Sequence, residues 1–174
     1  MCLGEPVNFS ARETQVFLNP KLAKTALDGL RTAVVNANLE AHTWLMSSGT
    51  ESESNGEHKL IALSYEAILA AAEVVVSTFG IESKDIYLKA LPDFHIGGVS
   101  IFARSFVSGC DVVDTPNFSW NPESYVDLLE NKKISLSSLV PAQVFDLVAK
   151  ELSPPPYLRL VFIGGGALDE KLFN

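Results

Sequence analysis

The feature that most constrains the fold of this chain is a regular alternation of short apolar segments with longer segments of helical character. The apolar segments, which we interpret as strands, lie at residues 43–46, 59–64, 85–90, 111–115, 135–140 and 158–163. The helical segments lie at residues 21–38, 65–79, 97–108, 121–130 and 141–152, with the start of a last helix at 168–173. Strands that alternate with helices are typical of βαβ units, so the sequence predicts an α/β fold with a mostly parallel sheet flanked by helices.

Residues at the ends of these segments support the helix boundaries. Ser64 and Asn121 belong to the types that cap helix N-termini, and Pro122 suits the first helical position. Gly80 is placed to end the helix at 65–79. The prolines at 154–156 should stop the preceding helix, because proline cannot continue a helical hydrogen-bond ladder. The helix at 97–108 is almost wholly apolar and is therefore expected to be buried on most sides.

Length and composition favour one folded domain. The chain has 174 residues, of which 47% are hydrophobic, which is enough for a sizeable core. We expect residues 1–174 to form a single α/β domain. Within it, residues 1–20 are mixed in character and are predicted to form a loosely packed N-terminal arm, while residues 21–174 form the folded part.

Charge and cysteine usage exclude several classes of partner. A net charge of −8 argues against nucleic acid, which needs a basic surface. The chain has no basic amphipathic stretch and no run of about 18 apolar residues, so we expect no membrane partner. Its first residues do not resemble a signal peptide, and Cys2 and Cys110 lie far apart without metal-ligand spacing. The sequence therefore predicts a soluble cytoplasmic protein with no metal-ligand set of its own.

A short polar segment between two predicted strands is the first candidate for chemistry. Ser47, Ser48, Gly49 and Thr50 can form a loop whose N–H groups and hydroxyls face an anion such as phosphate. Such segments are also common as simple turns. No Walker motif can be drawn through these residues.

The wider context of this loop resembles the AMP-forming acyl-CoA synthetases and related adenylating enzymes. The phosphate loop of that family reads TSGTTG-x-PKG; residues 47–50 match its first half, and NGEHK at 55–59 resembles its second half. Three further segments agree in order and spacing with the family: LPDFHIGG at 91–98, VPAQVFDLV at 140–148 and LRLVFIGGGAL at 158–168. The resemblance covers about residues 17–174, so residues 21–174 would be a partial AMP-binding domain. Within the family, FLNPKL at 17–22 is similar to o-succinylbenzoate–CoA ligases of menaquinone biosynthesis.

The resemblance implies a two-step reaction and a set of site residues. A small-molecule carboxylate would react with ATP in the presence of Mg²⁺ to form an acyl-adenylate, and coenzyme A would then displace AMP. The residues that would bind the phosphates of ATP are Ser47, Ser48, Gly49, Thr50, Gly56 and Lys59. The residues that would line the carboxylate-substrate pocket are His95, Gly97 and Gly98, and those under the adenylate are Gly164, Gly165, Gly166 and Ala167. His95 and Lys59 would be the catalytic residues.

Each of these residues also has a purely structural interpretation. His95 could be a buried histidine that bonds to a carbonyl group, Lys59 a solvated lysine, and residues 164–166 a tight turn. Asp93 occupies an apolar position of the family and is predicted to be a solvated turn residue. Glu51, Glu53 and Glu57 place carboxylates in a loop that would meet a triphosphate.

The sequence therefore leaves more than one function open. In the family, the YGxTE segment, the ribose-binding aspartate and the catalytic lysine of a C-terminal domain all come later than the position of Asn174. We expect this chain to be part of an acid–CoA ligase, inactive by itself, with a missing C-terminal portion or a homo-oligomeric state. The alternative is a non-catalytic binding or interaction module derived from an adenylating enzyme. An unrelated α/β nucleotide-binding protein is a third possibility.

Overall fold

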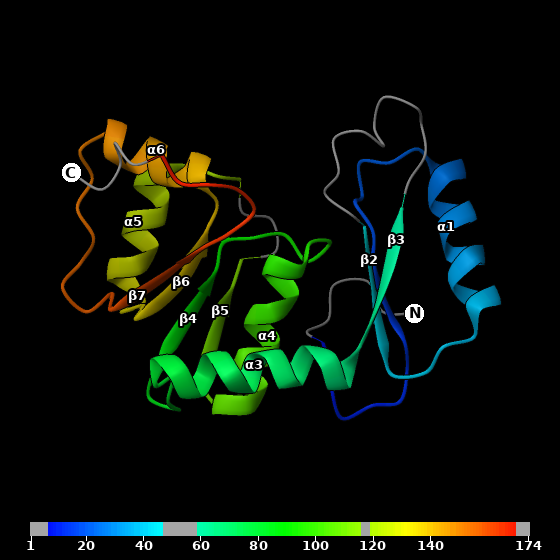
Figure 1. The fold of residues 1–174 in the computed structure, drawn as a ribbon. Coiled ribbons are helices and arrows are strands. Elements are labelled where there is room, and N and C mark those ends of the chain that lie inside the picture. Colours follow the sequence, from blue (N-terminus) through cyan, green and yellow to red (C-terminus); the bar gives the residue numbers. More distant parts are fainter. Residues whose placement is uncertain (1–6, 47–58, 116–118, 170–174) are drawn as a thin grey trace.

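Two sheets organise the chain (Figure 1). The computed structural model describes residues 7–46, 59–115 and 119–169. The smaller sheet has the order β1-β2-β3 and contains β1 (Gln15–Phe17), β2 (His42–Met46) and β3 (Leu60–Ser64). The larger sheet has the order β5-β4-β6-β7 and contains β4 (Ile86–Lys89), β5 (Asp111–Asp114), β6 (Leu136–Leu139) and β7 (Leu160–Ile163). The helices are α1 (Lys24–Ala37), α3 (Tyr65–Phe79), α4 (Ile96–Ser108), α5 (Pro122–Asn131) and α6 (Pro141–Ala149).

The larger sheet confirms the predicted α/β class. All of its strand pairs are parallel, with Ile86 opposite Asp111, Tyr87 opposite Leu136, and Leu136 opposite Leu160. Helices α3 and α4 cover one face of this sheet, and α5 and α6 cover the other (Figure 1). Because the strands are parallel, their carboxyl ends all meet at one edge of the sheet, where loops can build a site.

The smaller sheet is mixed. β1 runs parallel to β2, whereas β2 and β3 are antiparallel partners in which Met46 lies opposite Leu60. Helix α1 packs against one face of this sheet, where Val34 joins Val16 and Leu18. The other face packs against α3 and α4, so the smaller sheet is tied to the larger one through these two helices.

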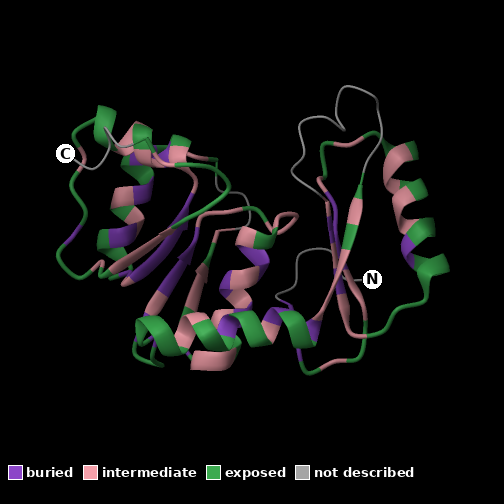
Figure 2. Cartoon of the chain, viewed as in Figure 1, coloured by how far each residue is buried: buried purple, intermediate pink, exposed green. Residues whose placement is uncertain are grey.

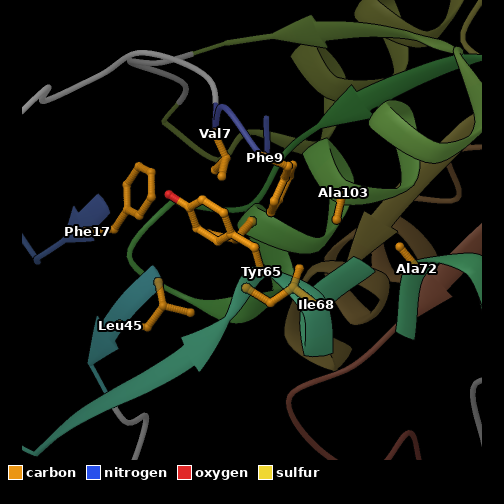
Figure 3. Packing of buried hydrophobic residues seen from close by; sticks show 9 residues of the cluster. Val7, Phe9, Phe17, Leu45, Tyr65, Ile68, Ala72 and Ala103 are labelled. Atoms are coloured by element: carbon orange, nitrogen blue, oxygen red, sulfur yellow. The ribbon is translucent and has the colours of Figure 1, made fainter. Parts of the chain in front are cut away.

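The N-terminal segment is packed more tightly than the predicted loose arm. Val7 and Phe9 are buried in the cluster that contains Tyr65 of α3 (Figure 3), and the rings of Phe9 and Tyr65 meet edge to face at 5.4 Å. Strand β1 also lies within this segment and pairs with β2. The apolar side chains of residues 7–18 alternate too irregularly for a sequence pattern to reveal this packing, which depends on distant partners.

Most predicted helix ends are confirmed. The Ser64 side chain accepts a hydrogen bond from the Ala67 amide at 3.2 Å, and Asn121 accepts one from the Ser124 amide at 2.8 Å. Gly80 ends α3 in the left-handed conformation, with φ 56°. Among the described residues, no helix is both long and apolar enough to span a lipid bilayer.

Two helix predictions need correction. Helix α6 ends at Ala149 instead of residue 152, since the chain turns there before the proline run begins. Leu168 and Asp169 are not helical, and the rest of the predicted last helix lies outside the described residues.

The prediction that the helix at 97–108 is buried on most sides is confirmed (Figure 2). Val99 and Ala103 of α4 pack in the core beside the smaller sheet, and Ile101 packs in the core beside the larger one. Of the residues of α4, only Ile96 and Phe106 are exposed.

Candidate functional site

The strand order of the larger sheet identifies the edge at which a ligand is expected to bind. The chain leaves β4 towards β5 on one side, and it returns through α5 to place β6 on the other side of β4. The carboxyl ends of β4 and β6 therefore form a topological switch point, which is where open α/β sheets bind their ligands. The loop that follows β4 is residues 91–95, and the residues that follow β6 are Val140 and Pro141.

The loop after β4 presents His95 at the start of α4. His95 is the N-cap residue of this helix, its backbone N–H donates to Pro92 O at 3.3 Å, and its carbonyl accepts from the Gly98 N–H at 3.0 Å. The imidazole is half-buried beside the Phe94 ring, with centroids 4.6 Å apart, and burial lowers the pKa of His95 below its usual value. A neutral imidazole at neutral pH can accept a hydrogen bond from a ligand or donate one to it.

Two glycines let this loop lie directly on the helix. A Cβ atom on Gly98 would meet the carbonyl oxygen of Pro92 at 2.4 Å, and one on Gly97 would meet Leu91 Cδ1 at 2.9 Å. Gly98 is therefore required by backbone packing, whereas the Gly97 contact is with a flexible side-chain end. The structure thus brings the predicted residues His95, Gly97 and Gly98 together.

The glycine-rich turn after β7 lies next to the residues that follow β6. The Gly164 N–H donates to Leu139 O at 3.1 Å. Gly165 has φ 80°, and a Cβ atom built on it would lie 3.4 Å from Val140 Cγ1; one built on Gly166 would lie 3.6 Å from Pro141 Cγ. Residues 164–167 are exposed, so this turn forms an open floor at the carboxyl edge of the sheet.

The predicted phosphate loop is described only at its two flanks. Ser47, Ser48, Gly49, Thr50 and Gly56 lie outside the described residues. Lys59 is exposed and immediately precedes β3. Because Met46 and Leu60 pair across β2 and β3, the two ends of the loop are held side by side.

A buried lysine that was not predicted from the sequence lies at the end of β4. Lys89 is only 4% exposed, and its ammonium group lies 2.8 Å from Asp93 Oδ1 and 2.9 Å from Asp114 Oδ1. Asp93 is therefore an ion-pair partner and only 29% exposed, not the solvated turn residue that was expected. The signal that could have found this pair is the charge itself: a lysine in an apolar strand, four residues before an aspartate at an apolar family position, calls for a partner.

A cavity of about 420 Å³ lies between β1 and the loop after β4. Its size is within the range of small-molecule sites. Its walls are mainly apolar, and Lys89, Asp93, Thr115 and Gln143 contribute the polar groups. Gln143 is largely buried, and its side-chain oxygen accepts the Val140 N–H at 2.9 Å.

A second cation missed by the sequence analysis lies on α4. The Arg104 guanidinium donates to the Tyr87 hydroxyl at 2.8 Å and lies over the Phe162 ring at 4.3 Å. The Tyr87 hydroxyl also bonds to Ser138 at 2.8 Å, which fixes this side of the guanidinium. Within the described residues Arg104 forms no ion pair with a carboxylate.

The described residues offer no preformed metal centre. In residues 7–46, 59–115 and 119–169, no group of three or more His, Cys, Asp or Glu side chains could hold a metal ion.

Comparison with protein families matches most of the chain to one family. The model of a family described as AMP-binding enzyme matches residues 15–174. A 2-succinylbenzoate–CoA ligase of Listeria innocua is 32% identical over 169 residues, which are 97% of this chain and 33% of that protein. One from Bacillus cereus is 24% identical over 176 residues, covering 100% of this chain and 35% of that protein. The chain thus spans about a third of the length of the curated relatives it matches.

Solved structures show the same fold. The o-succinylbenzoate coenzyme A synthetase of Bacillus subtilis in complex with ATP and magnesium ion is 25% identical, with a TM-score of 0.64; the match covers 75% of this chain and 26% of that one. The unliganded form of that synthetase matches with a TM-score of 0.72 at 19% identity, over 91% of this chain and 42% of that one. The second likeness is one of fold alone.

Proposed function

Because the chain belongs to the family of AMP-binding enzymes, we propose that it forms part of an ATP-dependent acid–CoA ligase. In this reaction a carboxylate oxygen attacks the α-phosphorus of ATP, the bond to the leaving pyrophosphate breaks, and an acyl-adenylate forms. The sulfur atom of coenzyme A then attacks the acyl carbon, and AMP leaves. The observation that carries this proposal is the meeting of two family segments at the carboxyl edge of the sheet, where Gly165 and Gly166 pack on Val140 and Pro141. These two residues follow β6, the strand next to β4, from which the loop that bears His95 leaves.

The residues of the chain would contribute mainly position and charge. Residues 47–50, Gly56 and Lys59 would bind the phosphates of ATP, with Lys59 as a point charge. His95 would face the reacting carboxylate at the start of α4, and residues 164–167 would support the adenylate. Bound Mg²⁺ would neutralise part of the phosphate charge. Orientation of the two reactants and stabilisation of the charge on phosphorus are the main sources of rate in such a reaction.

We propose a 2-succinylbenzoate-like acid as the substrate, and with it a role in menaquinone biosynthesis. The relatives named above are ligases of this acid, which carries two carboxylates. Only one of them reacts with ATP, so the other needs a cation in the site. Lys89 is already neutralised by Asp93 and Asp114. Arg104, by contrast, forms no ion pair among the described residues, so its guanidinium can bind a carboxylate. The Phe162 ring beneath this guanidinium lies two residues before the glycine turn. Arg104 is therefore the better candidate for the second carboxylate.

A second candidate function is a non-catalytic module that docks a partner. It is favoured by the edge strand β7 and by exposed apolar residues near it, since Ile163 is 41% and Phe145 is 59% exposed. An open sheet edge can pair with another chain. Within the ligase proposal, this same edge would face the remainder of a longer protein, and the 174-residue chain by itself would bind ATP without turnover.

Thermal unfolding of the 174-residue chain with and without Mg·ATP separates the two functions. A ligand at about 100 times its Kd stabilises the folded state by about 2.7 kcal/mol, which raises Tm by roughly 5–10 °C in a chain of this size. We expect Lys59→Ala to reduce this shift and Lys132→Ala to leave it unchanged, because Lys132 lies at the end of α5, away from the carboxyl edge. Absence of any shift at every Mg·ATP concentration would reject the ligase proposal in favour of the docking module.

A further inference from the structure

We infer that Lys89 is a positioning residue: through Asp93 it fixes the loop of residues 91–95 and thereby the orientation of His95. The inference deepens the proposed function, because it concerns the residue that would face the substrate carboxylate. Lys89 itself lies under this loop and has both carboxylate partners close by, at 2.8 and 2.9 Å. Its charge is therefore not free for a ligand, and its contribution is made through the segment that it holds.

The surroundings of Lys89 leave it few alternative positions. Its side chain is 4% exposed, and its ammonium group lies 5.5 Å from the centroid of the Phe102 ring on α4. Its carbonyl oxygen accepts a hydrogen bond from Thr115 Oγ1 at 3.0 Å, which joins the ends of β4 and β5. A charge this deeply buried must keep its partners, because desolvation without them is very costly.

The two carboxylates that hold Lys89 belong to different parts of the fold. Asp114 is the last residue of β5 and therefore part of the sheet. Asp93 lies in the loop, between Pro92 and the His95 that caps α4. The ion pair with Asp93 thus connects the rigid end of β4 to the middle of the loop, whereas the pair with Asp114 connects two strands that are already hydrogen-bonded.

The loop is held from the opposite side by the helix. The 2.4 Å that would separate a Gly98 Cβ from Pro92 O shows that the loop backbone rests directly on α4. With Asp93 drawn to Lys89 on one side and Pro92 pressed on Gly98 on the other, the loop has little freedom. The ion pair with Lys89 thus gives Asp93, a charged residue in a largely apolar segment, a structural role.

Replacement of each carboxylate in turn tests the inference, because the two variants remove the same kind of contact from the same lysine. Asp93→Ala and Asp114→Ala each leave Lys89 with one partner, so both chains should fold. The readouts are the imidazole NMR signals of the 174-residue chain, with the His95 signal assigned through His95→Gln, and hydrogen exchange of the His95 and Gly98 amides. Neither readout requires nucleotide.

We expect Asp93→Ala to displace the His95 signal and to speed exchange of the two amides about tenfold, because the loop loses its charged anchor. Asp114→Ala should change the exchange rates of the His95 and Gly98 amides by less than about twofold. Asp93→Asn keeps an oxygen atom that can accept a hydrogen bond from Lys89, so its His95 signal should stay near the original chemical shift. An unchanged His95 signal in Asp93→Ala, or an equal displacement in Asp114→Ala, would overturn the inference. Failure of Mg·ATP to stabilise the fold would instead overturn the proposed function and leave these results standing.

Discussion

Asp85 and Arg159 form a charge contact at the opposite edge of the larger sheet. The Asp85 carboxylate is 3% exposed and accepts hydrogen bonds from Arg159 Nε and Nη2, from Ser135 Oγ at 2.8 Å and from the Glu82 N–H at 2.9 Å. Arg159 also donates to the carbonyl oxygens of Phe79 and Gly80, which ties the start of β7 to the end of α3. These contacts lie at the amino ends of the strands, far from the candidate site, so their role is stability.

Replacement of Arg159 by methionine should lower the free energy of unfolding by about 2–3 kcal/mol. The reason is that Asp85 would remain buried without its charged partner; the loss is below the usual 3–5 kcal/mol because Arg159 is itself 38% exposed. Urea denaturation followed by circular dichroism measures the change. The exposed pair Lys150–Glu123 is the control, because removal of Lys150 should have almost no effect. If the Arg159 and Lys150 variants lost the same free energy of unfolding, the buried Asp85–Arg159 contact would not be the source of the stability.

The same contact predicts acid sensitivity. The hydrogen bonds from Arg159 hold the pKa of Asp85 well below its usual range. Since the folded-state pKa is depressed, the stabilisation is fully present above the ordinary aspartate pKa of about 4 and is lost as the pH falls below it. Asp85→Asn should therefore lower stability at pH 7 and flatten its decline between about pH 4 and pH 2. A variant whose acid transition matches that of the original chain would show that other carboxylates control it.

At the scale of elements, two glycines in helices should respond to alanine in opposite ways. Gly98→Ala should destabilise the chain by about 1–3 kcal/mol, because its Cβ would strike the backbone of Pro92 and displace the loop after β4. Gly29→Ala in α1 meets no atom within 4 Å and should stabilise by about 0.5–1 kcal/mol through helix propensity. Thermal unfolding of both variants measures the difference. A stable Gly98→Ala chain with an unchanged His95 NMR signal would show that the loop does not rest on α4.

At the scale of the whole molecule, the cluster around Phe9 joins the smaller sheet to α3 and α4. Phe9→Ala should lower the free energy of unfolding by about 3 kcal/mol, the usual loss for a buried aromatic side chain. Phe145→Ala, at an exposed position of α6, is the matched control and should be nearly neutral. Unfolding followed by both circular dichroism and tryptophan fluorescence should give one coincident transition, as expected of a single domain. A neutral Phe9→Ala would restore the loose-arm interpretation of residues 1–20.

The fold was predictable to the extent that it depends on local rules. The helix ends at Ser64, Gly80 and Asn121 follow from capping chemistry, which involves only residues close in sequence. The parallel sheet follows from the alternation of strands and helices. Of the candidate site, the glycines and His95 could be named because their segments occur in a known order. That their segments leave the same edge of one sheet could not, since it depends on the strand order β5-β4-β6-β7.

By itself, then, the sequence determined the class of fold, most helix boundaries and the family. Helix and strand propensity, helix capping and motif order all depend on residues that are close together in the sequence. Tertiary structure alone decided which side chains form ion pairs and which pack in the same core. Lys89 and Asp114 are 25 positions apart, and Asp85 and Arg159 are 74 apart, yet each pair is in contact. Phe9 became a core residue for the same reason. Burial and ion pairing depend on how elements distant in the sequence pack together, and local sequence patterns do not predict which elements come into contact.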